Sequence, residues 1–185
     1  GTGSKAFMGF ELKTGKVLWS KGKGVASYCS PLLATIDGQK QIIFANTTML
    51  HSYSPKGDSL WAIPISMNGP MAMPVLIDQN KIFISTVRSR GFCVVEVKDG
   101  SAKEILNSKN MRNDYGSSVY YNGYIYGFNI AAVQCISATT GEVKWVKRGL
   151  GKGTLILVDG KLLALSDKGK LLQIKATSEA YTEQG

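Results

Sequence analysis

Apolar, β-branched and aromatic residues are grouped along this chain in short runs, and turn-forming residues separate the runs. Runs of about four to eight such residues between turn signals predict β-strands rather than amphipathic helices. Asp-Gly or Asn-Gly pairs follow several of the runs, at residues 37–38, 122–123 and 159–160. These pairs accept the positive φ angles of tight hairpins. The pattern therefore predicts a series of antiparallel hairpins.

The predicted strands are organised in a repeat. The segment at residues 12–19 returns at 54–61 and 138–145, and a weaker copy stands at 97–104. The glycines of the four copies, Gly15, Gly57, Gly100 and Gly141, are 41 to 43 residues apart. This period is typical of four-stranded propeller blades and of helical solenoids. Because the runs favour strands, the sequence predicts an all-β fold, a β-propeller of four-stranded antiparallel blades.

The repeat divides the chain into blades. A closed ring covers sheet edges and the apolar faces between blades. We therefore expect a partial ring, about four blades of a seven- or eight-bladed propeller. One alternative is a small ring in which the last strands complete the first blade, and another is two copies joined in a larger ring. The predicted units are the end of a blade at 1–24, blades at 25–66, 67–108 and 109–149, and an incomplete blade at 150–185, ending after its third strand near residue 176.

A tryptophan recurs four residues after the repeat glycine in three copies, as Trp19, Trp61 and Trp145. A large aromatic residue at one place in each blade is expected to pack neighbouring blades together. The third copy has no tryptophan, and we expect Ile105 or Leu106 to take its place.

The repeat also carries a family resemblance. A strand ending in Ala or Ser, then x-x-Thr-Gly-x-x-x-Trp, is followed by Tyr28-Cys29-Ser30-Pro31 and an apolar run. This unit resembles the repeat of the PQQ-like, quinoprotein-type β-propellers over nearly the whole chain. That family includes quinoprotein alcohol dehydrogenases and cofactor-free relatives such as the propeller lipoprotein of the outer-membrane assembly machinery. The resemblance implies the propeller fold and a periplasmic or otherwise exported location, although no export signal is visible in the chain. It does not by itself imply an activity.

Composition and charge narrow the classes of partner. The chain has 185 residues, 44% of them hydrophobic and 19% charged, which is an ordinary globular composition. The formal net charge is +9, but most lysines fall in predicted turns, and no basic stretch alternates with aromatic residues. We therefore expect no nucleic-acid partner. The positive charge is still able to attract an acidic partner or an anionic membrane face.

Residues for catalysis or cofactor binding are scarce. Cys29, Cys93 and Cys135 are scattered, which fits neither a disulfide framework nor a metal site, and the latter two are expected in the core. His51 is the one histidine, and no catalytic triad, phosphate loop or carboxylate cluster emerges. The quinoprotein dehydrogenases resemble one another in a vicinal cysteine pair, which this chain lacks. The sequence therefore predicts no catalytic residue, no metal and no cofactor.

The predicted binding surface lies on one face of the propeller. Loops between blades share a face with loops between second and third strands, and here these loops are the irregular set, where recognition usually resides. Arginine and tyrosine are enriched in binding hot spots. The alternatives are that Arg112 pairs locally with Asp114, that Arg88 protects a sheet edge, and that the methionines at 67, 71 and 73 fill the core. The candidate binding residues are Arg88, Arg90, Arg112, Asn113, Asp114, Tyr115, Asn68 and Met71.

Two function hypotheses follow from these observations. The favoured one is a non-catalytic binding or scaffold module that presents its irregular loops to a protein or peptide. Missing blades of the same propeller, or a second copy, are further candidate partners. The alternative is a fragment of a PQQ-dependent quinoprotein dehydrogenase for alcohol or sugar oxidation, with PQQ and calcium as cofactors.

Overall fold

The structure is a computed structural model that describes residues 4–66, 68–87 and 91–185, and every regular element in these ranges is a β-strand. The strands form five antiparallel sheets, here numbered blade 1 to blade 5 in chain order. Blades 2, 3 and 4 have four strands in sequential order, blade 1 has two, and blade 5 has three. The predicted all-β architecture of four-stranded antiparallel blades is confirmed.

The strand bounds follow the predicted repeat closely. Blade 1 contains β1 (Phe7–Phe10) and β2 (Val17–Lys21); blade 2 contains β3 (Leu32–Ile36), β4 (Gln39–Ala45), β5 (Met49–Tyr53) and β6 (Ser59–Pro64); blade 3 contains β7 (Val75–Ile77), β8 (Lys81–Thr86), β9 (Gly91–Lys98) and β10 (Ser101–Ser108); blade 4 contains β11 (Val119–Tyr121), β12 (Tyr124–Asn129), β13 (Ala132–Ser137) and β14 (Val143–Arg148); blade 5 contains β15 (Gly153–Val158), β16 (Lys161–Ser166) and β17 (Leu171–Lys175).

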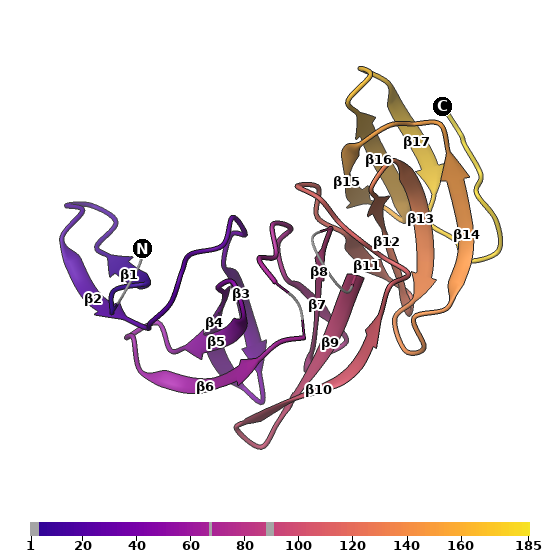
Figure 1. The fold of residues 1–185 in the computed structure, drawn as a ribbon. Coiled ribbons are helices and arrows are strands. Elements are labelled where there is room, and N and C mark those ends of the chain that lie inside the picture. The colour runs from indigo at the N-terminus through magenta and orange to yellow at the C-terminus, as the bar shows by residue number, and fades with distance from the viewer. Residues whose placement is uncertain (1–3, 67, 88–90) are drawn as a thin grey trace.

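The blades are arranged as in a propeller. In Figure 1 they follow one another along an arc, with β1 and β2 at one end and β15 to β17 at the other. The first strands of successive blades touch in turn, β3 with β7, β7 with β11 and β11 with β15. Blades 2 to 5 therefore each present their first strand to the centre of the fan. In the described residues β1 pairs with β2 alone, so the last strands do not complete the first blade.

The C-terminal residues cover the outer edge of blade 5. The sequence predicted a blade that ends after its third strand, and the tail instead runs antiparallel to β17. Lys175 N donates to Thr182 O at 2.9 Å, Gln184 N donates to Gln173 O at 2.7 Å, and Ile174 faces Glu183 in an isolated bridge. The tail thus occupies the position of a fourth strand and satisfies backbone groups that would otherwise form an open edge.

The apolar core consists of separate clusters between adjacent blades. Trp61 is 7% exposed and packs with residues of both blades 2 and 3, and Trp145 packs with residues of blades 4 and 5. Their indole N–H groups donate to Gln41 Oε1 at 2.8 Å and to Thr177 O at 2.7 Å. The tryptophans therefore have the predicted structural role, with the polar end of each buried ring satisfied.

Blade 3 replaces the tryptophan with a leucine. In blades 1, 2 and 4 the tryptophan directly follows a β-bulge in the last hairpin. In blade 3 the bulge falls at Ile105, and Leu106 follows it. Leu106 packs against the cluster between blades 3 and 4, whereas Ile105 is exposed. Of the two predicted residues, Leu106 takes the tryptophan position.

The shift of this bulge comes from the turn. Asp99 and Gly100 have φ angles of 51° and 73° and form a two-residue hairpin turn, with Lys98 opposite Ser101. The ladder is therefore longer than in the other blades, and Glu104 stands where the repeat predicts tryptophan. The Glu104 carboxylate accepts hydrogen bonds from Ser66 N at 3.1 Å and Ser66 Oγ at 2.7 Å. Glu104 thus holds the loop that leads from blade 2 into blade 3.

Phe92, which the repeat pattern does not mark, also lies at the interface between blades 3 and 4. A Cβ atom added to Gly141, which has a φ of 71°, would lie 2.8 Å from Cζ of Phe92. Trp19 makes the same approach to Gly57 in the next blade, where an added Cβ would lie 2.6 Å from the indole Cγ. Phe92 therefore supplies, from β9, the contact with the glycine of the following blade that Trp19 supplies from blade 1.

The cysteines in the strands behave as core residues. Cys93 and Cys135 are fully buried, as predicted, while Cys29 is half-buried. Burial raises the pKa of both buried thiols, that of Cys135 to about 11 and that of Cys93 further. Both therefore remain protonated at neutral pH and pack as small apolar side chains.

His51 gives blade 2 a predicted pH dependence. Its ring packs against Phe7 and Tyr53, and its Nε2 lies 3.2 Å from Asn46 Nδ2. Burial lowers the pKa of His51 in the folded protein, so the unfolded chain binds the proton more tightly. The stability contributed by neutral His51 is present above about pH 6.5 and is lost as the pH falls through the lower, folded pKa.

We expect thermal melts between pH 7.5 and pH 5 to show a falling Tm, and we expect the His51→Gln variant to lose part of this fall. Glutamine keeps a polar group near Asn46 but does not titrate. An identical pH dependence in the two proteins would contradict the role of His51.

Candidate functional site

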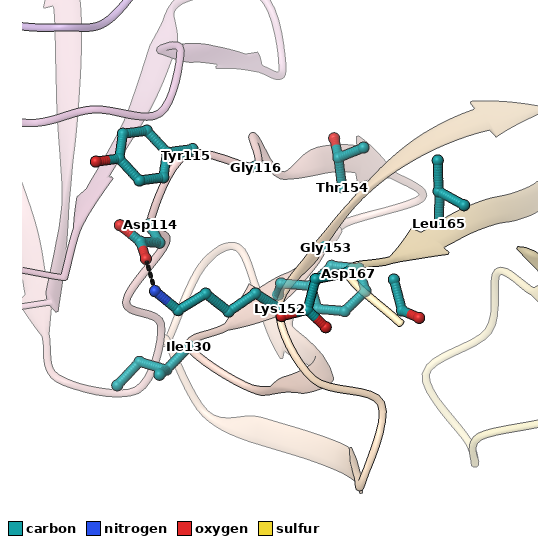
Figure 2. A pocket seen from close by; sticks show the side chains of 11 residues that line it. Asp114, Tyr115, Gly116, Ile130, Lys152, Gly153, Thr154, Leu165 and Asp167 are labelled. Carbon is teal, nitrogen blue, oxygen red and sulfur yellow. Dashed lines mark hydrogen bonds and ion pairs between the residues drawn. The ribbon is translucent and has the colours of Figure 1, made fainter. Parts of the chain in front are cut away.

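Irregular loops of blades 4 and 5 converge on a cavity of about 350 Å³. The loop that leads into β11 contributes Asp114 and Tyr115, and the loop that leads into β15 contributes Lys152 (Figure 2). Leu165 at the end of β16 and Ile130 in the β12–β13 turn complete this surface. Loops between blades and loops between second and third strands therefore meet on one face, as the propeller geometry requires.

A close backbone approach holds the two inter-blade loops together. A Cβ added to Gly116 would lie 2.2 Å from the carbonyl oxygen of Gly153, well inside van der Waals contact. The loop before β11 therefore packs directly on the start of β15, and only glycine allows this separation. The arrangement gives the cavity a rigid wall made of backbone atoms from two blades.

The charged side chains of the cavity form an ion pair. Lys152 Nζ lies 2.6 Å from Asp114 Oδ2, and Figure 2 shows the lysine side chain extending across to the aspartate. The Asp114 side chain is 14% exposed, while the Lys152 side chain is 56% exposed. The hydrogen bond to Asp114 raises the pKa of Lys152. The alternative of a local ion pair between Arg112 and Asp114 is not observed among the described residues, where Lys152 from the next inter-blade loop pairs with this carboxylate.

Tyr115, one of the predicted binding residues in this loop, is open to solvent. It is 70% exposed at the cavity rim. Asn113 is instead fully buried, and each of its side-chain polar atoms is used: Nδ2 donates to Phe128 O at 3.0 Å, and Oδ1 accepts from Ser118 Oγ at 3.0 Å. Asn113 therefore positions the loop and does not reach the surface.

Arg112 points to a second cavity, which is adjacent to the first. This cavity has a volume of about 470 Å³ and is lined by Arg112, Arg148, Gln134, Val146 and the β12–β13 turn. Ile130 lines both cavities, so the turn forms the wall between them. Arg148 and Lys152 were not among the predicted binding residues. The register of β14 places Arg148 at this cavity, and the loop from blade 4 to blade 5 brings Lys152 to Asp114.

Two further predicted residues, Asn68 and Met71, lie in the loop between β6 and β7. Asn68 is exposed, whereas Met71 is only 6% exposed, which favours the interpretation of Met71 as core filler. The loop that contains them touches the next inter-blade loop, since Met73 N donates to Ser117 Oγ at 3.0 Å. Arg88, Arg90 and Met67 lie outside the described residues.

The described residues offer no grouped set of side chains for a metal ion. They contain no cluster of three or more His, Cys, Asp or Glu side chains that could hold a metal ion. Asn113 and Asp114, the neighbouring pair on the loop face, already bond to protein groups. In the same part of the chain, no helix has the length and hydropathy needed to cross a membrane.

The fold and this loop face define a β-propeller of PQQ-like repeats, a class that presents loops on a rigid ring of sheets. Residues 2–147 match the family model described as outer membrane protein assembly factor BamB, and the chain belongs to that family. Among solved structures, BamB from Moraxella catarrhalis is similar, with a TM-score of 0.65 and 16% sequence identity. The match covers 96% of this chain and 54% of that one, so the chain spans about half of its length. No curated protein matches.

Proposed function

We propose that the chain is a non-catalytic binding module that holds a protein or peptide on the loop face of blades 4 and 5. The observation that carries the proposal is the cavity between these blades, where Tyr115 is 70% exposed and Leu165 is 48% exposed beside backbone walls. Exposed aromatic and aliphatic side chains around a preformed hollow are typical of the centre of a binding site.

The family supports the nature of the partner. The matching family is described as an assembly factor for outer membrane proteins. On that basis we propose a protein partner from outer-membrane protein assembly and a periplasmic location. The irregular loops supply the recognition surface, while the blades act as a scaffold that holds them in place.

Site-specific photo-cross-linking tests the proposal. A photoreactive amino acid is placed at Tyr115 on the loop face, or at Lys56 in the β5–β6 turn on the opposite face, in the protein in its native cells. Both positions are exposed to solvent. We expect protein adducts from position 115 and few from position 56, with mass spectrometry identifying the partner.

Two outcomes would contradict the proposal. Equal adducts from both positions, or none from either, would exclude the loop face as a specific protein-binding site. Saturable quinone and calcium binding with dye-linked oxidation of an alcohol or sugar would contradict the non-catalytic assignment.

A further inference from the structure

The second cavity, beside the β12–β13 turn, has the charge of an anion-binding site. Arg112 and Arg148 both line it, and in the described residues it has no acidic lining residue. Neither guanidinium lies within ion-pair distance of a carboxylate in that part of the chain. Asp114, the nearest carboxylate in sequence to Arg112, is already held by Lys152. Both arginines therefore remain available for an external carboxylate, which a guanidinium binds through two parallel hydrogen bonds.

The floor of this cavity is built from fixed polar contacts. Arg112 N donates to Asn129 Oδ1 at 3.2 Å, and Arg112 O accepts from Ile130 N at 3.1 Å. Gln134 is 2% exposed; its Nε2 donates to Asn110 O, and its Oε1 accepts from Asn129 Nδ2 at 3.0 Å. This amide network holds the backbone of Arg112 against the hairpin. The cost of ordering that backbone is therefore met before a ligand binds.

Arg148 reaches the same cavity because of the register of β14. Arg148 stands opposite Ala132, and Val146 stands opposite Gln134, so these four residues share one face of blade 4. Val146 is 40% exposed and adds an apolar strip beside the arginine. The ligand surface thus combines two guanidinium groups with an aliphatic patch.

The turn between the two cavities has an unusual backbone. Ile130 has a φ of 57°, in the left-handed region that β-branched residues rarely adopt. Its place between Asn129 and Ala132 in a two-residue turn would ordinarily favour glycine or asparagine. Strained residues of this kind concentrate at ligand-binding sites. Here the strain presents an isoleucine side chain to both cavities.

We infer that the cavity of Arg112 and Arg148 takes a carboxylate of an acidic peptide segment, with a neighbouring aliphatic side chain of that segment on Val146 and Ile130. The inference rests on the proposed function and names the chemistry of its partner. Two guanidinium groups match one or two carboxylates, whereas a nucleic acid would need a longer basic track with stacking aromatic residues. The apolar strip also favours a peptide, because it can pack against an aliphatic side chain of that segment.

Fluorescence anisotropy with two labelled peptides tests this inference. The probes are the hexapeptide Gly-Leu-Glu-Leu-Glu-Gly and its counterpart with glutamine in place of both glutamates. We expect the acidic peptide to bind at least about tenfold more tightly, from the energy of a charge-assisted hydrogen bond. We expect Arg112→Gln and Arg148→Gln each to weaken its binding about fivefold to tenfold.

The matched control is the double variant Lys16→Gln and Lys56→Gln, which removes two positive charges from exposed turns of the opposite face. It should change binding by less than about twofold at moderate salt, because exposed charges at that range are screened. All variants are first compared by circular dichroism and thermal melts, since their side chains are exposed and should leave the fold intact.

Three outcomes would overturn the inference. The first is equal affinity for both peptides, and the second is an equal loss of peptide affinity in the control and the arginine variants. The third is that the arginine variants bind the peptide normally but no longer bind an oligothymidine strand, which would assign the site to phosphate. If the inference fails while adducts from position 115 persist, the proposed function stands with a different partner chemistry. Loss of both results would reject both.

Discussion

Replacing Trp61 by alanine is expected to lower the free energy of unfolding by about 3–5 kcal/mol, the usual range for a buried aromatic residue. Trp61 is almost fully buried between blades 2 and 3, where it packs in a cluster that includes Ile84 and Val95. The substitution also removes the indole donor to Gln41 Oε1, although Ser52 Oγ still donates to that oxygen at 2.8 Å. The cavity left between two sheets cannot close without moving one blade.

Urea denaturation followed by far-ultraviolet circular dichroism measures this loss. Trp19→Ala is the matched control, because Trp19 holds the same repeat position but is only partly buried, and its Nε1 bonds to Pro55 O at 3.2 Å. We expect the control to lose clearly less stability, in proportion to the smaller apolar area removed from water. Equal losses in the two variants would show that blade contacts do not follow burial.

The repeat made most of the fold predictable from sequence. A glycine at a fixed place in each hairpin, with Asp-Gly or Asn-Gly after a first strand, marks turns whose φ angles few other residues accept. Position 37 illustrates this, since Asp37 has a φ of 51°.

Departures from the repeat were harder to predict, because they depend on pairing. The Asp99-Gly100 turn lengthens the ladder of blade 3 and moves the bulge to Ile105. Counting four residues from Gly100, as in the other copies, then places Glu104 at the tryptophan position. The strand register is needed to show that Leu106 occupies that position. The tail after Ala176 also lacks an alternating pattern, and its position along β17 depends on backbone hydrogen bonds and on Tyr181, whose ring contacts that of Trp145.

The candidate site was predicted in part. Asp114 and Tyr115 were chosen from residue type and loop position, and both line the cavity. Lys152, the partner of Asp114, lies in the following inter-blade loop, and no local signal connects the two. Asn113 shows the opposite error. Its amide suited a ligand in the sequence, but the Phe128 carbonyl and the Ser118 hydroxyl use both ends of that amide. Contacts between blades therefore decide which loop residues remain free.

The second large effect is expected for Gly116→Ala. The added methyl group would lie 2.2 Å from Gly153 O, and because this neighbour is backbone, the two loops must separate. Overpacking of this kind costs about 1–3 kcal/mol, occasionally more. The same movement should open the wall of the loop-face cavity, so we expect photo-cross-linking from Tyr115 to fall sharply. The measurements are the urea midpoint and the yield of adducts from that position.

Gly123→Ala provides a control that separates stability from site geometry. Gly123 has a φ of 84°, and an added Cβ would meet nothing within 4 Å. Alanine there bears the cost of the left-handed conformation, about 1–2 kcal/mol, without touching the cavity. The control should lose comparable stability yet retain its adducts from Tyr115. If both variants lost adducts in proportion to their loss of stability, the cavity wall would have no specific part in binding. If Gly116→Ala kept its full stability and its full adduct yield, the close approach of the two loops would not be a constraint.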